Sequence, residues 1–238
     1  MDFILSVITI CRNAKKMLEM TAESLICQNT INYQWIVIDG NSVDGTQSII
    51  HKYEKNCDLF ISEPDDGIYD AMNKGLSYAK GEYVLFLNAG DTLYNSKTLS
   101  SINFFINSDL IVGDLYFCQK KENNKSPIKL PQNYLLNKML PHQATFFRRD
   151  IFDKYGYFDT SYRIAGDYEM FSRLIQKYKV SYAHVPDIIA NFDETGISSN
   201  DKFRNLRKKE NHRIRWKYFP SYRYSFKSMR QMVRNFFG

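Results

Sequence analysis

Four short apolar segments, separated by segments with helical spacing, constrain the fold of this chain more than any other feature. The apolar segments are Leu5–Cys11, Tyr33–Ile38, Leu59–Ser62 and Tyr83–Leu87. Glycine and polar residues punctuate their ends, as is typical of buried strands. Strands that alternate with helices form βαβ units, and successive units build a parallel sheet. We therefore predict an α/β fold with a mostly parallel central sheet flanked by helices.

Beyond Asp91 the alternation becomes less regular, although strand and helix patterns continue. Further strands are predicted at residues 110–118, 144–148 and 180–186, and helices at 99–106, 133–139 and 166–178. We predict one domain over residues 1–200, followed by a basic helical extension over residues 201–238.

The positive charge of the chain is concentrated in this C-terminal extension. The net charge is +6, yet residues 202–238 carry twelve Lys or Arg and a single acid, Glu210. A basic segment of this kind favours an anionic surface, such as a membrane, a nucleic acid or an acidic protein. No nucleic-acid recognition motif is evident, so no nucleic acid is expected as a partner. A solvated basic helix is the alternative interpretation.

Residues 226–237 have the pattern of a basic amphipathic helix, which is suited to an anionic lipid interface. Their apolar stripe consists of Phe226, Met229, Val233 and Phe236. Aromatic side chains that would add to an interface are Trp216, Tyr218, Tyr222 and Tyr224. The alternative is that the stripe packs on the body of the protein or on a second subunit of a homodimer.

The cysteines and the N-terminus indicate a cytoplasmic protein. Cys11, Cys27, Cys57 and Cys118 form no CxxC pair and no metal-binding spacing, which is typical of free thiols in a reducing compartment. The N-terminal residues lack the basic start of a signal peptide, and no segment reaches the roughly 20 apolar residues of a spanning helix. Any membrane contact is therefore expected to be peripheral, on the inner face.

Three acidic residues are candidates for the chemistry, and two of them lie where sheets of this kind bind ligands. Asp39 ends the second predicted strand and Asp91 follows the fourth. Open α/β sheets bind ligands at these strand ends, so Asp39 is suited to a base or ribose and Asp91 to a divalent cation. Asp167 begins a predicted helix and is a candidate general base. The structural alternatives are a turn at Asp39, a loop cap at Asp91 and a helix N-cap at Asp167.

A polar helix face lies between Asp39 and Asp91. Asp70, Asn73 and Lys74 are three and four residues apart, so they share one face of the predicted helix. A lysine among polar groups near a strand end is suited to a phosphate. The alternative is a solvated face with an Asp70–Lys74 ion pair.

Together these segments resemble the family 2 inverting glycosyltransferases, which have the GT-A fold. The order and spacing of the segments make the resemblance specific, and it covers roughly residues 4–195. It is closest to the bacterial branch that builds surface polysaccharides such as capsule and O-antigen. The matching segments are Thr9–Asn13, Asp39–Thr46, Glu63–Gly75, Asn88–Asp91, Pro141–Gln143 and Gly166–Glu169.

The resemblance implies a role for each matching position. Asp39 would hydrogen-bond the base of a UDP-sugar, and Asp91 would bind Mg²⁺ or Mn²⁺ bridging the diphosphate. Asp167 would be the general base that removes the proton of the acceptor hydroxyl. Further donor-site residues would be Thr9, Asn13, Asp70, Asn73, Lys74, Asn88, His142 and Gln143.

The resemblance also implies how the chain is divided. Residues 1–95 would bind the nucleotide, and residues 96–200 would bind a lipid-linked saccharide acceptor. Asn88 stands where the metal motif of the family has its first acid, so the protein would offer the cation one anionic ligand. A sugar nucleotidyltransferase is disfavoured because no glycine-rich loop follows the first strand. A non-catalytic binding module is disfavoured because the three acids are retained.

Overall fold

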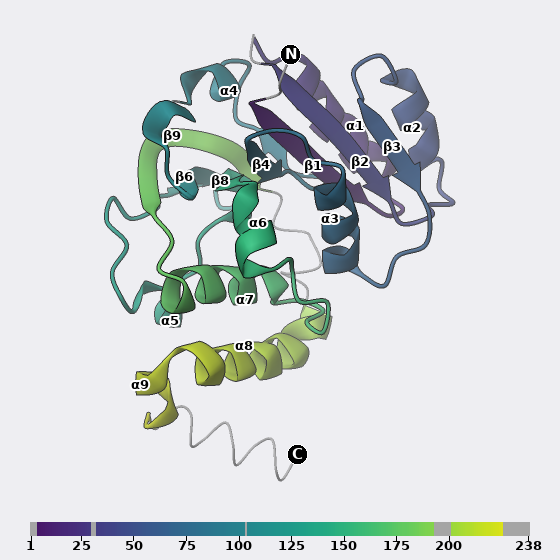
Figure 1. The fold of residues 1–238 in the computed structure, drawn as a ribbon. Coiled ribbons are helices and arrows are strands. Elements are labelled where there is room, and N and C mark those ends of the chain that lie inside the picture. Colours follow the sequence, from purple (N-terminus) through teal and green to yellow (C-terminus); the bar gives the residue numbers. More distant parts are fainter. Residues whose placement is uncertain (1–3, 30–31, 103, 193–200, 226–238) are drawn as a thin grey trace.

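One mixed sheet forms the centre of the molecule (Figure 1). The computed structural model describes residues 4–29, 32–102, 104–192 and 201–225. The strand order is β3-β2-β1-β4-β8-β6-β9-β5, and β7 pairs with β6. The strands are β1 (Leu5–Cys11), β2 (Tyr33–Asp39), β3 (Leu59–Ser62), β4 (Tyr83–Phe86), β5 (Thr92–Leu93), β6 (Leu110–Phe117), β7 (Glu122–Asn124), β8 (Thr145–Arg148) and β9 (Tyr182–Phe192).

The first four strands form the predicted parallel half of the sheet. β1 pairs in parallel with both β2 and β4, and β2 pairs in parallel with β3. Helices α1 (Lys15–Ile26) and α2 (Thr46–Lys52) pack on one face through Leu18 and Ile49, whereas α3 (Ile68–Ser77) packs on the other through Met72. The prediction of an α/β fold with a parallel sheet flanked by helices is confirmed for this half.

The second half of the sheet adds antiparallel pairs. β8 pairs antiparallel with β4 and β6, and β9 then runs parallel to β6. β9 extends to Phe192, well past the predicted end at Pro186. The register between β6 and β9 shifts between Val112 and Leu115, and this irregularity accommodates the proline, so the pairing resumes beyond it. The predicted helix at 99–106 is instead a short helix α4 (Thr98–Ser101) and a 3₁₀ turn (Phe104–Ile106). Helix α6 (Asp150–Tyr155) and strand β5 were not predicted.

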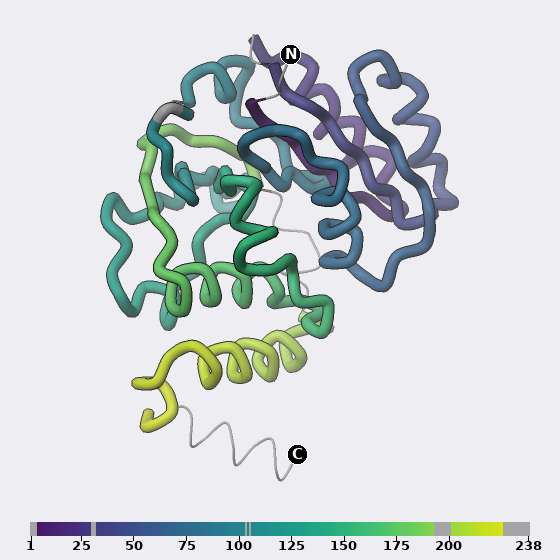
Figure 2. Tube along the Cα trace, viewed as in Figure 1, coloured from purple at the N-terminus to yellow at the C-terminus, as the bar shows by residue number. Residues whose placement is uncertain are grey.

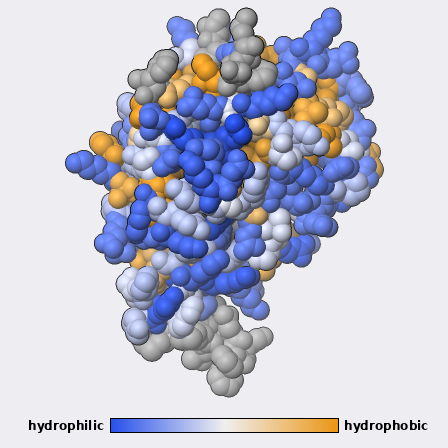
Figure 3. Space-filling view, viewed as in Figure 1, coloured by the Kyte–Doolittle hydropathy of each residue, from blue (hydrophilic) through white to orange (hydrophobic). Residues whose placement is uncertain are grey.

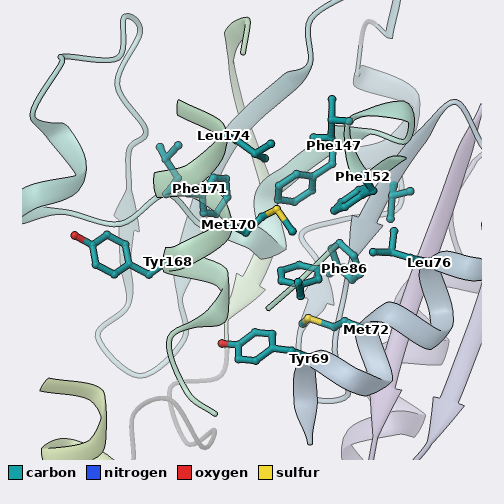
Figure 4. Close-up of a cluster of buried hydrophobic side chains, with 14 of the residues drawn as sticks. Tyr69, Met72, Leu76, Phe86, Phe147, Phe152, Tyr168, Met170, Phe171 and Leu174 are labelled. Atoms are coloured by element: carbon teal, nitrogen blue, oxygen red, sulfur yellow. The ribbon is translucent and has the colours of Figure 1, made fainter. Parts of the chain in front are cut away.

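An aromatic cluster joins the two halves and fixes the helix that carries Asp167 (Figure 4). Phe86 of β4 packs edge-on against Phe147 of β8 and Phe152 of α6, with ring centroids 5.9 and 6.2 Å apart. Phe147 in turn lies 5.4 Å from Phe171 of α7 (Gly166–Ser172). The remaining short helix of this half is α5 (Tyr134–Asn137).

The described part of the C-terminal extension packs on the body. Helix α8 (Arg204–Tyr218) runs beside α7, and α9 (Pro220–Arg223) follows it (Figure 2). Tyr218 and Tyr222 are buried, so the prediction that they face an interface is wrong, whereas Trp216 and Tyr224 are 38% and 87% exposed. The predicted apolar stripe at 226–237 lies outside the described residues.

Most of the surface in the view of Figure 3 is polar, as expected for a domain that buries most of its apolar side chains. The face drawn in Figure 3 is mainly hydrophilic, with apolar side chains gathered in several separate patches. No helix within the described ranges is both long enough and apolar enough to span a bilayer.

Candidate active site

Two cavities meet on the side of the sheet where β1 and β4 end. The first, which we call the sheet-edge cavity, has a volume of about 430 Å³ and is lined by residues 10–14 at the end of β1 and 88–91 after β4. The second, which we call the α8 cavity, has a volume of about 350 Å³ and lies between β6, α7 and α8. Residues that line both cavities are His142, Gln143, Ile164, Asp167 and Phe192.

Helix α1 holds the loop that carries Asp91. The Thr21 hydroxyl donates to the Asp91 carbonyl at 2.8 Å and accepts a bond of 3.1 Å from the Gly90 N–H. Gly90 has a φ of 107°, a left-handed conformation that favours glycine. Asp91 is therefore fixed in the wall of the sheet-edge cavity with only 6% of its surface exposed.

A chain of polar contacts runs along the boundary between the two cavities. The Asn88 Nδ2 atom lies 3.4 Å from His142 Nε2, and His142 Nδ1 lies 3.4 Å from Asp167 Oδ2. A neutral imidazole that carries its proton on Nδ1 satisfies both contacts, because Nε2 then accepts from the Asn88 amide. His142 therefore orients Asn88 on one side and Asp167 on the other.

Tyr69 of α3 contacts the Asp167 carboxylate. Its hydroxyl lies 2.9 Å from the Ile164 carbonyl and 3.3 Å from Asp167 Oδ1. Burial, together with the negative charge of Asp167, raises the pKa of Tyr69 well above its usual value, so the phenol stays protonated and remains a donor. This approach needs Gly166, because a Cβ atom there would lie 2.7 Å from the Tyr69 ring.

The donor set at the sheet edge fits one divalent cation bound jointly with a diphosphate. The described residues contain no group of three or more His, Cys, Asp or Glu that would hold a metal alone. However, the buried Asn88 Oδ1 atom has no hydrogen-bond partner among the described residues, and it lines the same cavity as Asp91. Amide and carboxylate oxygens are ligands that Mg²⁺ and Mn²⁺ accept, with phosphate and water oxygens completing the shell.

Asp39 and Thr9 are not among the described residues that line the sheet-edge cavity. The buried Asp39 carboxylate accepts hydrogen bonds from Ser62 at 2.6 Å and from both the backbone N–H and the hydroxyl of Ser42. Cys11 does line the cavity, and its S–H donates to the Asp39 carboxylate at 3.6 Å. Thr9 points into the core, where its hydroxyl accepts a 3.0 Å bond from the Trp35 indole.

The predicted polar face of α3 also points away from the cavity. The Asn73 amide makes two bonds of 2.9 and 3.0 Å to the backbone of Phe158, so it joins α3 to the second half of the domain. Lys74 forms ion pairs of 2.9 Å with Glu63 and 3.4 Å with Asp70. The Asp70–Lys74 ion pair of the structural alternative is therefore present, whereas Asn73 bonds the backbone of Phe158 instead of facing solvent. A phosphate contact of these residues stays a prediction.

The remaining predicted residues do come together. Asn13, Asn88, Asp91, His142, Gln143 and Asp167 all line the sheet-edge cavity. The sequence-based prediction missed Arg12, Asp65 and Tyr69 in the same wall, although Asp65 and Tyr69 lie in the Glu63–Gly75 segment that carries the resemblance. It also missed Arg207, Asn211 and Arg215 of α8, whose spacing of four residues is the one local signal.

Comparison with known sequences places this arrangement in a family. Residues 6–173 match the family model described as glycosyl transferase family 2. A PGL/p-HBAD biosynthesis glycosyltransferase of Mycobacterium bovis is 29% identical over 202 residues, covering 82% of this chain and 78% of the relative. An uncharacterized glycosyltransferase of Mycobacterium tuberculosis is 30% identical over 203 residues, covering 82% of this chain and 77% of the relative.

Solved structures at lower identity share the fold. S. aureus TarS in complex with UDP-GlcNAc matches 81% of this chain and 59% of its own, with a TM-score of 0.69 and 20% identity. This chain spans 44% of a longer TarS chain. The mannosyltransferase PcManGT of Pyrobaculum calidifontis, solved with GDP-Man and Mn²⁺, matches 91% of this chain and 64% of its own, with a TM-score of 0.68 and 18% identity. The family match over most of the domain and the shared fold together show that this chain belongs to glycosyl transferase family 2.

Proposed function

We propose that this chain transfers a sugar, with inversion, from a nucleotide diphosphate donor to a hydroxyl group of a saccharide acceptor. The observation that carries the proposal is the position of Asp167, which lines both cavities where they meet. A donor in the sheet-edge cavity and an acceptor in the α8 cavity would then meet at this carboxylate. The UDP-GlcNAc complex of TarS, which has the same fold, supports a UDP-sugar as the donor.

The proposed reaction is a single displacement at C1 of the donor sugar. Asp167 accepts the proton of the acceptor hydroxyl, whose oxygen forms the new bond to C1 of the sugar. The bond from C1 to the diphosphate oxygen breaks at the same time, and the nucleoside diphosphate leaves with the electron pair. A single displacement from the opposite face inverts the configuration at C1. His142 and Tyr69 hold Asp167 in place through the contacts at 3.4 and 3.3 Å.

Asp91 and the Asn88 amide oxygen are the residues that would hold Mg²⁺ or Mn²⁺ against the diphosphate. When bound, the cation offsets the negative charge that develops on the leaving group. The complex of PcManGT with GDP-Man and Mn²⁺ supports a divalent cation bound together with the donor.

A donor screen with a matched variant tests this function. The protein is incubated with UDP- and GDP-sugars and Mn²⁺, and released nucleoside diphosphate is measured. We expect release from at least one donor, and Asp167→Asn should lower this turnover by about 100-fold or more while UDP binding is retained. Turnover in Asp167→Asn close to that of the wild type would contradict the proposed base.

The basic residues of the extension favour a lipid-linked acceptor at the inner face of the cell membrane. The test is co-sedimentation with anionic vesicles. Because Phe219 and Tyr222 are buried, the truncation should remove only residues 226–238 and leave the packed part intact. We expect the truncated protein to remain in the supernatant where the full chain sediments. Equal sedimentation of both would contradict the membrane contact.

A further inference from the structure

Helix α8 carries two adjacent stripes with different surroundings. Glu210, Ile214 and Tyr218 are four residues apart and buried against the body. The stripe beside it consists of Arg207, Asn211 and Arg215, and all three line the α8 cavity. Because residues four apart share one helix face, burial of the first stripe fixes the second stripe in the cavity wall.

The buried stripe is held by specific contacts. The Glu210 carboxylate accepts three backbone hydrogen bonds, of 2.8 to 3.0 Å, from Arg163, Ile164 and Ala165. The Tyr218 hydroxyl donates to the buried Glu169 carboxylate of α7. These contacts join α8 to the segment that leads into Asp167, so the cavity-facing stripe has a defined position relative to the base.

The described residues that line the α8 cavity include more basic than acidic side chains. Among the described residues that line it, the cations are Lys138, Arg207 and Arg215, and the only acid is Asp167. Tyr168 does not compensate these charges, since burial raises the pKa of this phenol and keeps it neutral. Its hydroxyl instead lies 3.2 Å from Arg215 Nε, which fixes that guanidinium at the wall.

We propose that the acceptor carries an anionic group, a phosphate or a carboxylate, which Arg207 and Arg215 bind in the α8 cavity. The planar guanidinium groups match either oxyanion in geometry. This inference rests on the proposed function, because it assumes that the α8 cavity receives the acceptor. It also gives α8, which lies beyond the 6–173 family match, a part in acceptor selection.

Binding of three matched probes tests the inference. Glucose 1-phosphate, glucuronate and glucose are titrated by NMR into the full chain, with saturating UDP and Mn²⁺ occupying the sheet-edge cavity. We expect at least one anionic probe to bind more tightly than glucose by about tenfold, and Arg207→Gln to abolish this preference. The anionic probe that binds distinguishes a phosphate acceptor from a carboxylate acceptor. Raising the salt concentration from ~0.05 to ~0.5 M should weaken only anionic binding, a measurement that needs no variant.

The matched control removes two charges from the same helix outside the cavity. Lys208→Gln with Lys209→Gln should leave the preference intact, because both lysines are exposed and neither lines the α8 cavity. Arg207→Lys, which keeps the charge, should retain a weaker preference. Equal binding of glucose and the anionic probes would overturn the inference, as would loss of UDP affinity in Arg207→Gln. Wild-type protein that fails to bind UDP would contradict the donor site, while the ranking of the probes would still decide the acceptor charge.

Discussion

The carboxylate of Glu210 accepts a hydrogen bond of 2.8 Å from the backbone N–H of Ala165, two residues before Asp167. The same carboxylate also accepts hydrogen bonds from the backbone N–H groups of Arg163 and Ile164. A buried carboxylate with three donors holds a backbone segment firmly, because charge-assisted hydrogen bonds are roughly twice as strong as neutral ones. Glu210, the single acid of residues 202–238, is therefore a positioning residue for the proposed base.

Replacing Glu210 should lower both stability and turnover. Glu210→Ala leaves three N–H groups without their acceptor, and we expect a loss of about 1–3 kcal/mol in the free energy of unfolding. Urea titration measures that loss. At temperatures where the variant is fully folded, kcat should fall more than tenfold while donor KM changes little. A kcat equal to that of the wild type would show that Glu210 acts on stability alone.

Asp91 should control cation affinity. Asp91→Asn removes the anionic ligand but keeps a side chain of the same size, so the fold should be unchanged. We expect the dissociation constant of Mn²⁺, measured by calorimetry in the presence of UDP, to rise about 10-fold to 100-fold. Chelation with EDTA should stop sugar transfer by the wild type. Unchanged Mn²⁺ affinity in Asp91→Asn would place the cation elsewhere.

Asp65 should contribute to UDP binding, the role that the sequence suggests for Asp39, whereas Asp39 should stabilise the fold. Asp65 lines the sheet-edge cavity and lies against Gly40, where a Cβ atom would be 2.4 Å from its Oδ2 atom. Asp65→Ala should therefore weaken UDP binding about tenfold with little effect on stability. Asp39→Asn should instead destabilise the fold by about 1–3 kcal/mol, because Asp39 holds Ser42 and Ser62. Calorimetry with UDP and urea unfolding of both variants separate these roles, and the reverse pattern would restore Asp39 as the base-binding residue.

Stability should fall at alkaline pH. Burial, together with a neighbouring carboxylate, raises the pKa of Tyr69 and Tyr218 above the ordinary value of 10.0. In the unfolded chain these phenols lose their protons near pH 10, so above that pH the folded state holds more protons. The free energy of unfolding should thus be insensitive to these groups below about pH 9 and decline above about pH 10. Urea unfolding at several pH values gives the slope, and Tyr218→Phe should flatten it. An equal slope in this variant would exclude Tyr218 as a contributor.

Local sequence patterns were sufficient for the parallel half of the domain. Its strands and helices are short-range features, since the apolar run at Tyr83 and the turn at Asn88–Gly90 are each read from adjacent residues. The second half was less predictable. Strand β9 continues through Pro186 because its register with β6 shifts there, and the extra residues of that irregularity, Pro186 among them, lie in β9. A proline at such a position looks in the sequence like the end of a strand, and only the pairing with β6 shows that the strand continues.

The direction of a polar side chain at a strand end was decided by its neighbours in space. Asp39, at the end of β2, and Asp91, shortly after β4, look alike in the sequence. The Asp39 carboxylate accepts hydrogen bonds from Ser42 and Ser62. Asp91 is instead held in the cavity wall by a hydrogen bond from the Thr21 hydroxyl to its backbone carbonyl. Asn73 likewise hydrogen-bonds the Phe158 backbone, and Lys74 forms an ion pair with Glu63.

The sequence by itself determined the family, the parallel half of the sheet and the two acids, Asp91 and Asp167, that line the sheet-edge cavity. These depend on motifs and periodicities carried by short segments. Only the tertiary structure decided that α8 completes a second cavity and that Glu210 holds the segment before Asp167. Those contacts join residues more than forty positions apart in the chain, and their geometry arises only when helix α8 packs against α7.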